Sequence, residues 1–179
     1  METIENKIRG LIKRSSEILG INQEEIILKI VVDNVIFETE SNACVLQGNI
    51  LHVNENWLNR MNITKDETEL RMLIYHEVRH YYQIQQIAKY TNKQPVNEDV
   101  LRIMQWKYNF ENYISNTNEN LSYYNQHVEI DANAFGILMF NYDISRGIKK
   151  ISGNLTSIPS DIYPEIDKRL KELISFYRL

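Results

Sequence analysis

Cysteine, proline, glycine and long apolar runs are all scarce in this 179-residue chain, and each shortage excludes a class of protein. The single cysteine, Cys44, excludes an intramolecular disulfide and is ordinary for a reducing compartment. Six glycines and three prolines exclude a collagen-like or low-complexity chain. No apolar run approaches the roughly 20 residues that cross a bilayer, and the N-terminus carries no export signal. We therefore expect a cytoplasmic protein with no membrane partner.

Charge of one sign is also scarce. Twenty Lys and Arg oppose 24 Asp and Glu, so the net charge is −4. Because nucleic-acid binding needs clustered positive charge, a direct nucleic-acid partner is not expected. The 43% hydrophobic content is sufficient for one core, so we expect residues 1–179 to form a single domain. The 20 Asn and 25 Ile are typical of AT-rich genomes and suggest a bacterial or phage source.

Short strands are predicted in the first third of the chain. Residues 26–37 are rich in β-branched side chains on both sides of Asp33 and Asn34, which predicts two strands joined by a turn. Residues 43–53 repeat this pattern around Gly48, whose tolerance of positive φ suits a hairpin turn. The first third of the chain is therefore expected to form four strands.

Helical periodicity surrounds these strands. Residues 4–19 predict an amphipathic helix that ends at Gly20. A capping box at Thr64–Glu67 opens the strongest predicted helix, which continues to about Tyr90. Later helices are predicted over about 100–114, about 121–140 and, beyond Pro159 and Pro164, about 166–174. The order of elements indicates an α+β fold with one antiparallel or mixed sheet.

An HExxH motif lies in the middle of the strongest predicted helix. Residues four apart stack on one face of a helix, so His76 and His80 can reach one zinc ion. Glu77 then faces the same site as a candidate general base. Composition alone predicts on the order of 0.01 such motifs in a chain of this length. Ordinary polar or core histidines on a metal-free helix remain the alternative.

A zinc site of this kind needs a third protein ligand from another element. The segment from Glu129 to Gly136 offers Glu129, with Asn133 one turn later on the same face. Asn133 is expected to bond a ligand imidazole and fix its tautomer. Asp131 and His127 lie on the opposite side of the helical wheel, so we expect a solvated carboxylate and a surface or packing imidazole.

These motifs together resemble the gluzincin metallopeptidases, and most closely the ImmA/IrrE-like family. The similarity covers Leu73–Gln83 and Glu129–Gly136 closely, about a tenth of the chain. It implies a zincin-like fold with a small sheet packed on the ligand-bearing helices. The resemblance also implies His76, His80 and Glu129 as zinc ligands and Glu77 as the catalytic carboxylate. By the same analogy, an edge strand at Ile50–Asn54 would hold a peptide substrate by β-addition.

Two features depart from that family. Arg79 stands where a small residue is usual, so the guanidinium needs either room or a carboxylate partner. The interval from His80 to Glu129 is long, and the added residues are predicted to form the helix around Trp106. Both departures concern substrate specificity more than metal binding.

The function expected from these residues is zinc-dependent peptide hydrolysis, with limited cleavage of an intracellular protein. The family analogy suggests a transcriptional repressor as the substrate. The alternative is a non-catalytic zincin-like binding or regulatory module, associated with a phage or mobile element. Sequence does not choose the residue that stabilises the oxyanion; the candidates are Tyr82, Tyr123, Tyr124, His127 and His52. It also leaves the oligomeric state open. Cys44 is expected to be a structural thiol.

Overall fold

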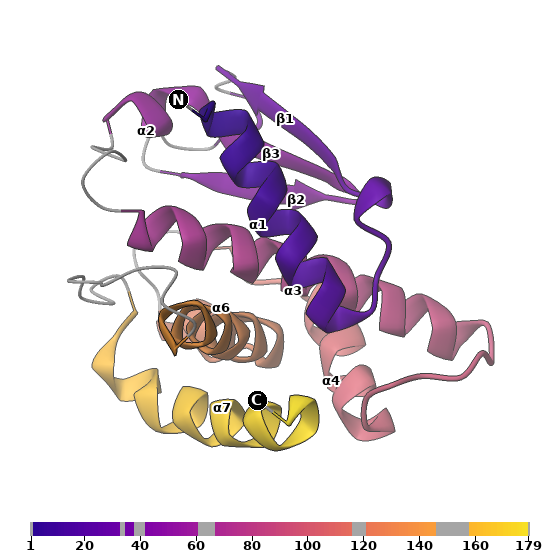
Figure 1. Ribbon diagram of the computed structural model, residues 1–179. Coiled ribbons are helices and arrows are strands. Elements are labelled where there is room, and N and C mark those ends of the chain that lie inside the picture. Colours follow the sequence, from indigo (N-terminus) through magenta and orange to yellow (C-terminus); the bar gives the residue numbers. More distant parts are fainter. Residues whose placement is uncertain are drawn as a thin grey trace.

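The computed structural model describes residues 2–32, 35–37, 42–60, 67–115, 121–145 and 158–178. The fold is mixed α+β, mostly helical, with one small three-stranded sheet. Figure 1 shows the sheet at the top, α3 beneath it, α6 below α3, and α7 at the bottom, with α1 crossing in front of α3. The helices are α1 (Ile4–Leu19), α2 (Glu55–Arg60), α3 (Thr68–Thr91), α4 (Val100–Glu111), α5 (Leu121–Tyr124), α6 (His127–Ser145) and α7 (Tyr163–Tyr177), with 3-10 turns η1 (Gln23–Glu25) and η2 (Ser160–Ile162).

The sheet has the order β1-β3-β2. The predicted hairpin is confirmed: β2 (Cys44–Gln47) runs antiparallel to β3 (Ile50–Asn54), and Gly48 has a φ of 63° at the turn. β1 (Ile27–Val31) pairs with β3 in parallel. The prediction of a second strand before Phe37 was wrong: residues 35–37 form no strand, and Val35 and Ile36 lie in a turn, with Val35 92% exposed. The expected turn at Asp33 and Asn34 lies outside the described residues.

The strand implied as the substrate-binding edge is not an edge. Ile50–Asn54 is β3, the central strand, and its Leu51 and Val53 are fully buried. Because both of its ladders are occupied, β3 has no free backbone groups for an added peptide. The edges are β1 and β2, and β2 is the strand that packs on α3.

The first two long helices match their predictions closely. α1 ends at Gly20, which has a φ of 64° and donates its N–H to Ser16 O. α3 spans 24 residues and ends at Thr91, close to the predicted end at about Tyr90. The predicted capping box was wrong in detail: Glu67 directly precedes the helix and pairs with Lys7 and Arg71 instead of capping it. Thr64 lies outside the described residues.

The single helix predicted over 121–140 is divided into α5 and α6 by a break at Gln126. The Gln126 side chain accepts the Ile114 N–H at 3.0 Å and donates to Ile114 O at 2.9 Å. These bonds tie the break to the segment that follows α4. As a result, Glu129 lies in the first turn of α6.

The two remaining helices were also predicted from periodicity. α4 ends at Glu111, slightly earlier than expected, and its Trp106 is fully buried. α7 begins before the predicted terminal helix, because Pro164 occupies its first turn instead of a loop. Proline is well suited to that position, since the first N–H groups of a helix have no partner within the helix.

Helices α3 and α6 pack closely at Gly136. A Cβ added at this buried glycine would lie 3.2 Å from Met72 O, a backbone atom of α3. Farther along α6, Asp143 accepts bonds from Arg14 at 2.7 Å, Arg71 at 2.9 Å and the Tyr75 hydroxyl at 2.6 Å. These contacts hold α1, α3 and α6 in one arrangement, and α3 and α6 carry the candidate ligands.

Gly136→Ala should therefore destabilise the protein. The added methyl group would push α6 away from the Met72 backbone, and overpacking of this kind costs about 1–3 kcal/mol. Gly10→Ala is the matched control, because Gly10 is exposed on α1 with nothing within 4 Å of an added Cβ. That variant should gain roughly 0.5–1 kcal/mol from helix propensity. The free energy of unfolding in urea measures both; equal effects of the two variants would contradict the close approach at Gly136.

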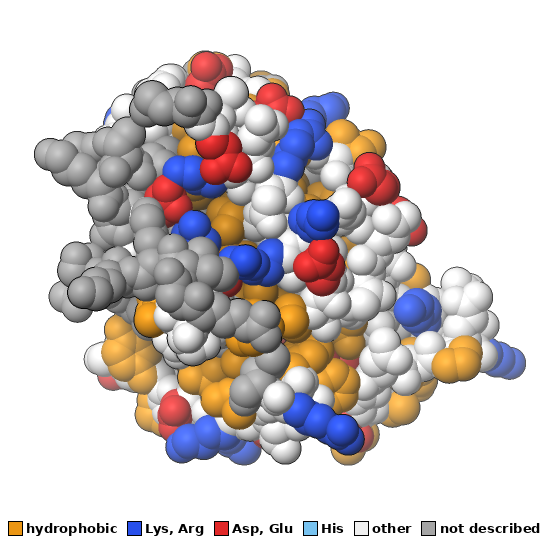
Figure 2. Space-filling view, viewed as in Figure 1, with side chains coloured by type: hydrophobic (Ala, Val, Ile, Leu, Met, Phe, Trp, Pro, Cys, Tyr) orange, Lys and Arg blue, Asp and Glu red, His pale blue; other side chains and the backbone are white. Residues whose placement is uncertain are grey.

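One face of the molecule mixes charges of both signs, in line with the near-neutral composition. On the face in Figure 2, Lys and Arg side chains alternate with Asp and Glu side chains. Across the described part of the chain, no helix combines the length and apolar character needed to span a membrane.

Candidate metal centre

The structure brings three side chains from two helices together at one point. His76 and His80 lie one turn apart on α3, and their Nε2 atoms are 2.9 Å apart. Glu129 on α6 places Oε2 3.4 Å from His76 Nε2 and Oε1 3.4 Å from His80 Nε2. The side chains of the two histidines are 12% and 10% exposed, whereas Glu129 is fully buried. The carboxylate is therefore shielded from solvent, whereas both imidazoles remain slightly accessible to it.

Both histidines direct Nε2 at Glu129 because Nδ1 is bonded elsewhere. His76 Nδ1 lies 3.1 Å from Asn133 Oδ1, and His80 Nδ1 lies 2.8 Å from Gln83 Oε1. Amide oxygens only accept hydrogen bonds, so each Nδ1 carries a proton and donates it. In the neutral imidazoles, both Nε2 lone pairs therefore point into the space next to Glu129.

The donor set fits a zinc ion. Four ligands about 2.0 to 2.1 Å from zinc in a tetrahedron lie about 3.3 to 3.4 Å from one another. The two distances from Glu129 to the imidazoles match this spacing, and the distance between the imidazoles is somewhat shorter. Glu129 Oε2 is buried without a hydrogen-bond partner. A buried carboxylate oxygen with no partner is costly, and a cation bound to it would remove that cost.

A proton and a metal ion would compete for this site. Burial raises the pKa of the Glu129 carboxyl, but the two imidazoles lower it well below its usual range. Burial lowers the pKa of His80, but the Glu129 carboxylate raises it to about 9, with a smaller effect of Glu77. In the metal-free protein His80 is therefore protonated at neutral pH. The additional proton resides on Nε2, since Nδ1 already has one.

Zinc affinity should consequently rise with pH. Below pH 9 the metal must displace the Nε2 proton of His80, and displacement of one proton makes the apparent affinity change roughly tenfold per pH unit between about pH 7 and 8.5. Competition with a chelator of known pH dependence measures this slope. A flat profile over that interval would show that His80 does not exchange a proton for the metal.

Glu77 lies beside the cluster without belonging to it. Its carboxylate is buried, and Cys44 Sγ on β2 approaches Oε1 at 4.0 Å. Burial raises the pKa of Glu77; the two imidazoles and a backbone hydrogen bond from Leu46 oppose this shift, and Glu129 adds to it. A carboxylate with a raised pKa is a stronger base than an exposed one, as a general base requires. Burial and the neighbouring Glu77 and Glu69 raise the pKa of Cys44, so this thiol stays protonated, consistent with the structural role expected.

Asn133 has the expected geometry, since its Oδ1 faces Nδ1 of His76 at 3.1 Å. Asn133→Ala should weaken zinc binding by about 10 to 100-fold, the usual effect of removing the partner that orients a ligand imidazole. Zinc titration of the variant against a chelator measures the change. Complete loss of metal, equal to that of His76→Ala, would instead indicate that Asn133 is itself a ligand.

The residues expected to point away from the metal do so, with one correction. His127 is exposed, as expected. Asp131 is not solvated: its side chain is 2% exposed and bonds to Arg79, Arg169 and Gln83. Arg79 is fully buried and has carboxylate partners, the second of the two alternatives, room or a carboxylate partner, that its position was expected to require. A polar pattern on a helical wheel cannot distinguish a solvated carboxylate from one paired with distant arginines.

Gln83, which bonds His80 Nδ1, and two residues of the interval before Glu129 were not identified from sequence. The Tyr113 hydroxyl donates to Glu129 Oε1 at 2.8 Å, and the Phe110 ring packs edge-on against His80 with centroids 6.0 Å apart. Both belong to α4 or the segment after it, within the long interval between His80 and Glu129. Only the fold brings this interval back to the ligands, so no local signal marks these residues.

The five candidates for the residue that stabilises the oxyanion differ in how near they lie to the candidate metal ligands. Tyr123 interacts with both Glu129 and Tyr113, and Tyr124 stacks edge-on against Tyr123. Tyr82 is buried under the guanidinium of Arg79, 4.5 Å from its ring centroid. His52 is a buried residue of β3, and His127 is exposed at the start of α6. Tyr123, together with the unpredicted Tyr113, therefore lies nearest to the candidate ligands.

Comparison of this chain with protein-family models, with curated proteins and with solved structures found no match. The resemblance to the ImmA/IrrE-like family therefore rests on the residues of the HExxH motif and the Glu129 segment alone.

Proposed function

We propose that this protein is a zinc-dependent metallopeptidase with a zincin-like fold. The observation that carries the proposal is the convergence of His76 Nε2 and His80 Nε2 on the buried Glu129 carboxylate, each 3.4 Å from one of its oxygens, with Oε2 lacking a hydrogen-bond partner. His76, His80 and Glu129 would hold the metal. Three protein ligands leave one tetrahedral position for water or substrate, as catalytic zinc sites require.

The chemistry follows from the groups around that position. Zinc bound there would supply Lewis acidity, which polarises a carbonyl group and lowers the pKa of water. Glu77 would accept the proton of the attacking water and return it to the leaving amine. Its raised pKa favours both transfers, because the carboxylate is basic enough to take the proton and its acid form is stable enough to keep it briefly.

The substrate side of the proposal concerns β2. This edge strand packs on α3, and its Leu46 is hydrogen-bonded to Glu77. An extended peptide that pairs with the outer edge of β2 would therefore lie beside the general base. We propose an intracellular protein as the substrate, cut at limited sites, and a transcriptional repressor as its class by family analogy.

The test is metal-dependent proteolysis. Protein purified without chelator should contain one zinc per chain, and it should produce new termini in candidate repressors or lysate proteins, mapped by mass spectrometry. A chelator should stop this cleavage and added zinc should restore it. Bound zinc with no cleavage would favour the non-catalytic binding module, and absence of zinc would refute the metal centre.

A further inference from the structure

A series of hydrogen bonds leads from His80 into the interior, away from the metal-facing nitrogen. His80 Nδ1 donates to Gln83 Oε1 at 2.8 Å. Gln83 Nε2 donates to Val128 O at 3.0 Å and to Asp131 Oδ2 at 2.7 Å. Gln83 is fully buried, so no bulk water competes for its amide. Because both donors are used, only Oε1 can face His80.

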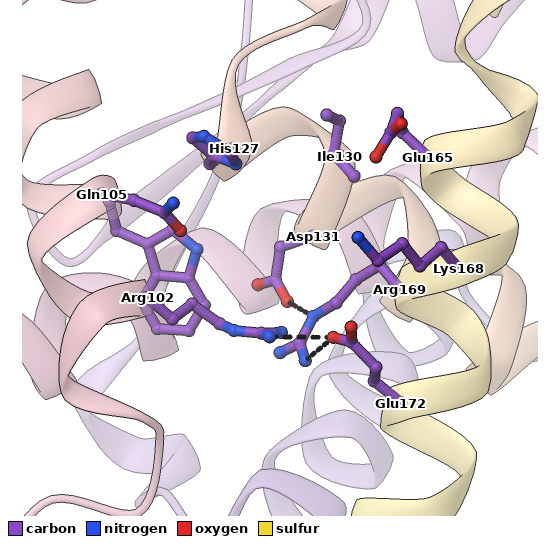
Figure 3. Close-up of a pocket in the computed structure, with 10 residues that line it drawn as sticks. Arg102, Gln105, His127, Ile130, Asp131, Glu165, Lys168, Arg169 and Glu172 are labelled. Carbon is purple, nitrogen blue, oxygen red and sulfur yellow. Dashed lines mark hydrogen bonds and ion pairs between the residues drawn. The ribbon is translucent and has the colours of Figure 1, made fainter.

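Asp131 is held in turn by two arginines. Arg79 donates to its two oxygens at 2.8 and 3.1 Å, and Arg169 donates to Oδ1 at 2.7 Å. Figure 3 shows Arg169 extending from α7 to Asp131, with Glu172 on its other side. Both oxygens of Asp131 thus accept from guanidinium N–H groups, which can only donate. Oδ2 therefore faces Gln83 as an acceptor and requires its NH₂ group.

We propose that Gln83 is a positioning residue of the metal centre and that Asp131 sets its orientation. The proposal rests on the zinc centre proposed above and identifies the residues that orient one of its ligands, His80. Asp131 binds the NH₂ group of Gln83, which turns Oε1 toward His80. The imidazole then keeps its proton on Nδ1 and presents the Nε2 lone pair to the metal. The ion pairs of Asp131 with Arg79 and Arg169 thus influence a metal ligand, His80, that Asp131 does not contact.

The substitution Asp131→Asn tests whether Asp131 sets the orientation of the Gln83 amide. If the introduced amide keeps its oxygen at the Oδ1 position, which faces Arg169 Nε and Arg79 Nη2, its NH₂ group replaces Oδ2 and faces both Arg79 Nε and Gln83 Nε2. Two NH₂ groups would then face each other, and rotation of the Gln83 amide would relieve the clash. That rotation would place a donor against His80 Nδ1 and favour the tautomer with its proton on Nε2, which cannot bind zinc.

The chain offers a matched control for each variant. Gln86 is equally buried one turn farther along α3, where its Oε1 accepts the Asn97 N–H at 2.8 Å. Glu98 pairs with the same arginines as Asp131, with Arg79 at 2.8 Å and Arg169 at 3.2 Å. Within the described part of the chain, Glu98 makes no hydrogen bond to Gln83. The variants Gln86→Met and Glu98→Gln therefore reproduce the loss of buried polar contacts without the effect on His80.

The experiment measures zinc affinity by chelator competition and the His80 Nδ1–H signal by ¹⁵N-edited NMR. Gln83→Met and Asp131→Asn should each bind zinc about 10 to 100-fold more weakly than the parent. The Nδ1–H proton of His80, protected from exchange in the parent, should be lost in both variants. Gln86→Met and Glu98→Gln should keep the affinity and the signal, even where thermal unfolding shows lower stability.

Two results would overturn the proposal: parental zinc affinity in a folded Gln83→Met, or equal losses in variants and controls. Failure of the zinc centre itself is distinguishable, because the parent would then bind no zinc. In that case the Nδ1–H signal, read in the metal-free protein above the pKa of His80 of about 9, where the imidazole is neutral, still decides whether Gln83 and Asp131 fix its tautomer.

Discussion

Glu77→Gln is expected to retain zinc and the fold while losing peptide hydrolysis. The amide has nearly the same shape as the carboxylate but cannot accept the proton of the attacking water. A positioned general base contributes typically about 10² to 10⁴-fold to a rate, so kcat should fall by that amount. The buried position of Glu77, beside the cluster but outside it, is the structural reason to expect loss of rate without loss of metal.

Parallel assays of the parent and Glu77→Gln, loaded with equal zinc and incubated with the same substrate, measure this effect. Circular dichroism and zinc content provide the controls for folding and metal. Equal cleavage by both proteins would contradict the role of Glu77 and would point to a contaminating protease or another base. Loss of zinc from Glu77→Gln would instead assign the carboxylate to the metal itself.

Removal of a ligand should have the second large effect. His76→Ala, His80→Ala and Glu129→Ala each leave two protein ligands, so zinc affinity should fall well beyond the roughly 10 to 100-fold expected of residues that only orient a ligand. His127→Ala is the matched control, because this exposed histidine begins the same helix as Glu129. Metal analysis after gel filtration should find zinc in the control and none in the three variants.

Unchanged zinc in all three variants would refute the assignment. Zinc retained only by Glu129→Ala would require a different third ligand. Asp131 could not replace it without rearrangement, because both of its oxygens are bonded to buried arginines. Tyr113 would be the first residue to test in that case, since its hydroxyl lies 2.8 Å from Glu129 Oε1.

The local features of this protein were predictable because they depend on neighbouring residues. Helical periodicity and Gly20 located α1, and Gly48 located the hairpin turn, since each reflects short-range backbone geometry. The HExxH spacing placed His76 and His80 on one face of α3, and helix geometry alone requires this. The helical wheel also placed Glu129 and Asn133 on the same face of α6, opposite to Asp131.

Tertiary structure decided which of these groups meet and what surrounds them. Whether β3 is an edge or a central strand depends on the partners that the chain assembles, and hydrophobic periodicity is the same in both cases. Glu129, Tyr113 and Phe110 reach the histidines only because α4 and α6 fold back onto α3. The buried charge of Asp131 depends on Arg169, 38 residues away, and a distant ion pair leaves no local trace in the sequence. Covalent spacing and backbone geometry set the helical faces on which the candidate ligands lie, whereas long-range packing brought His76, His80 and Glu129 together.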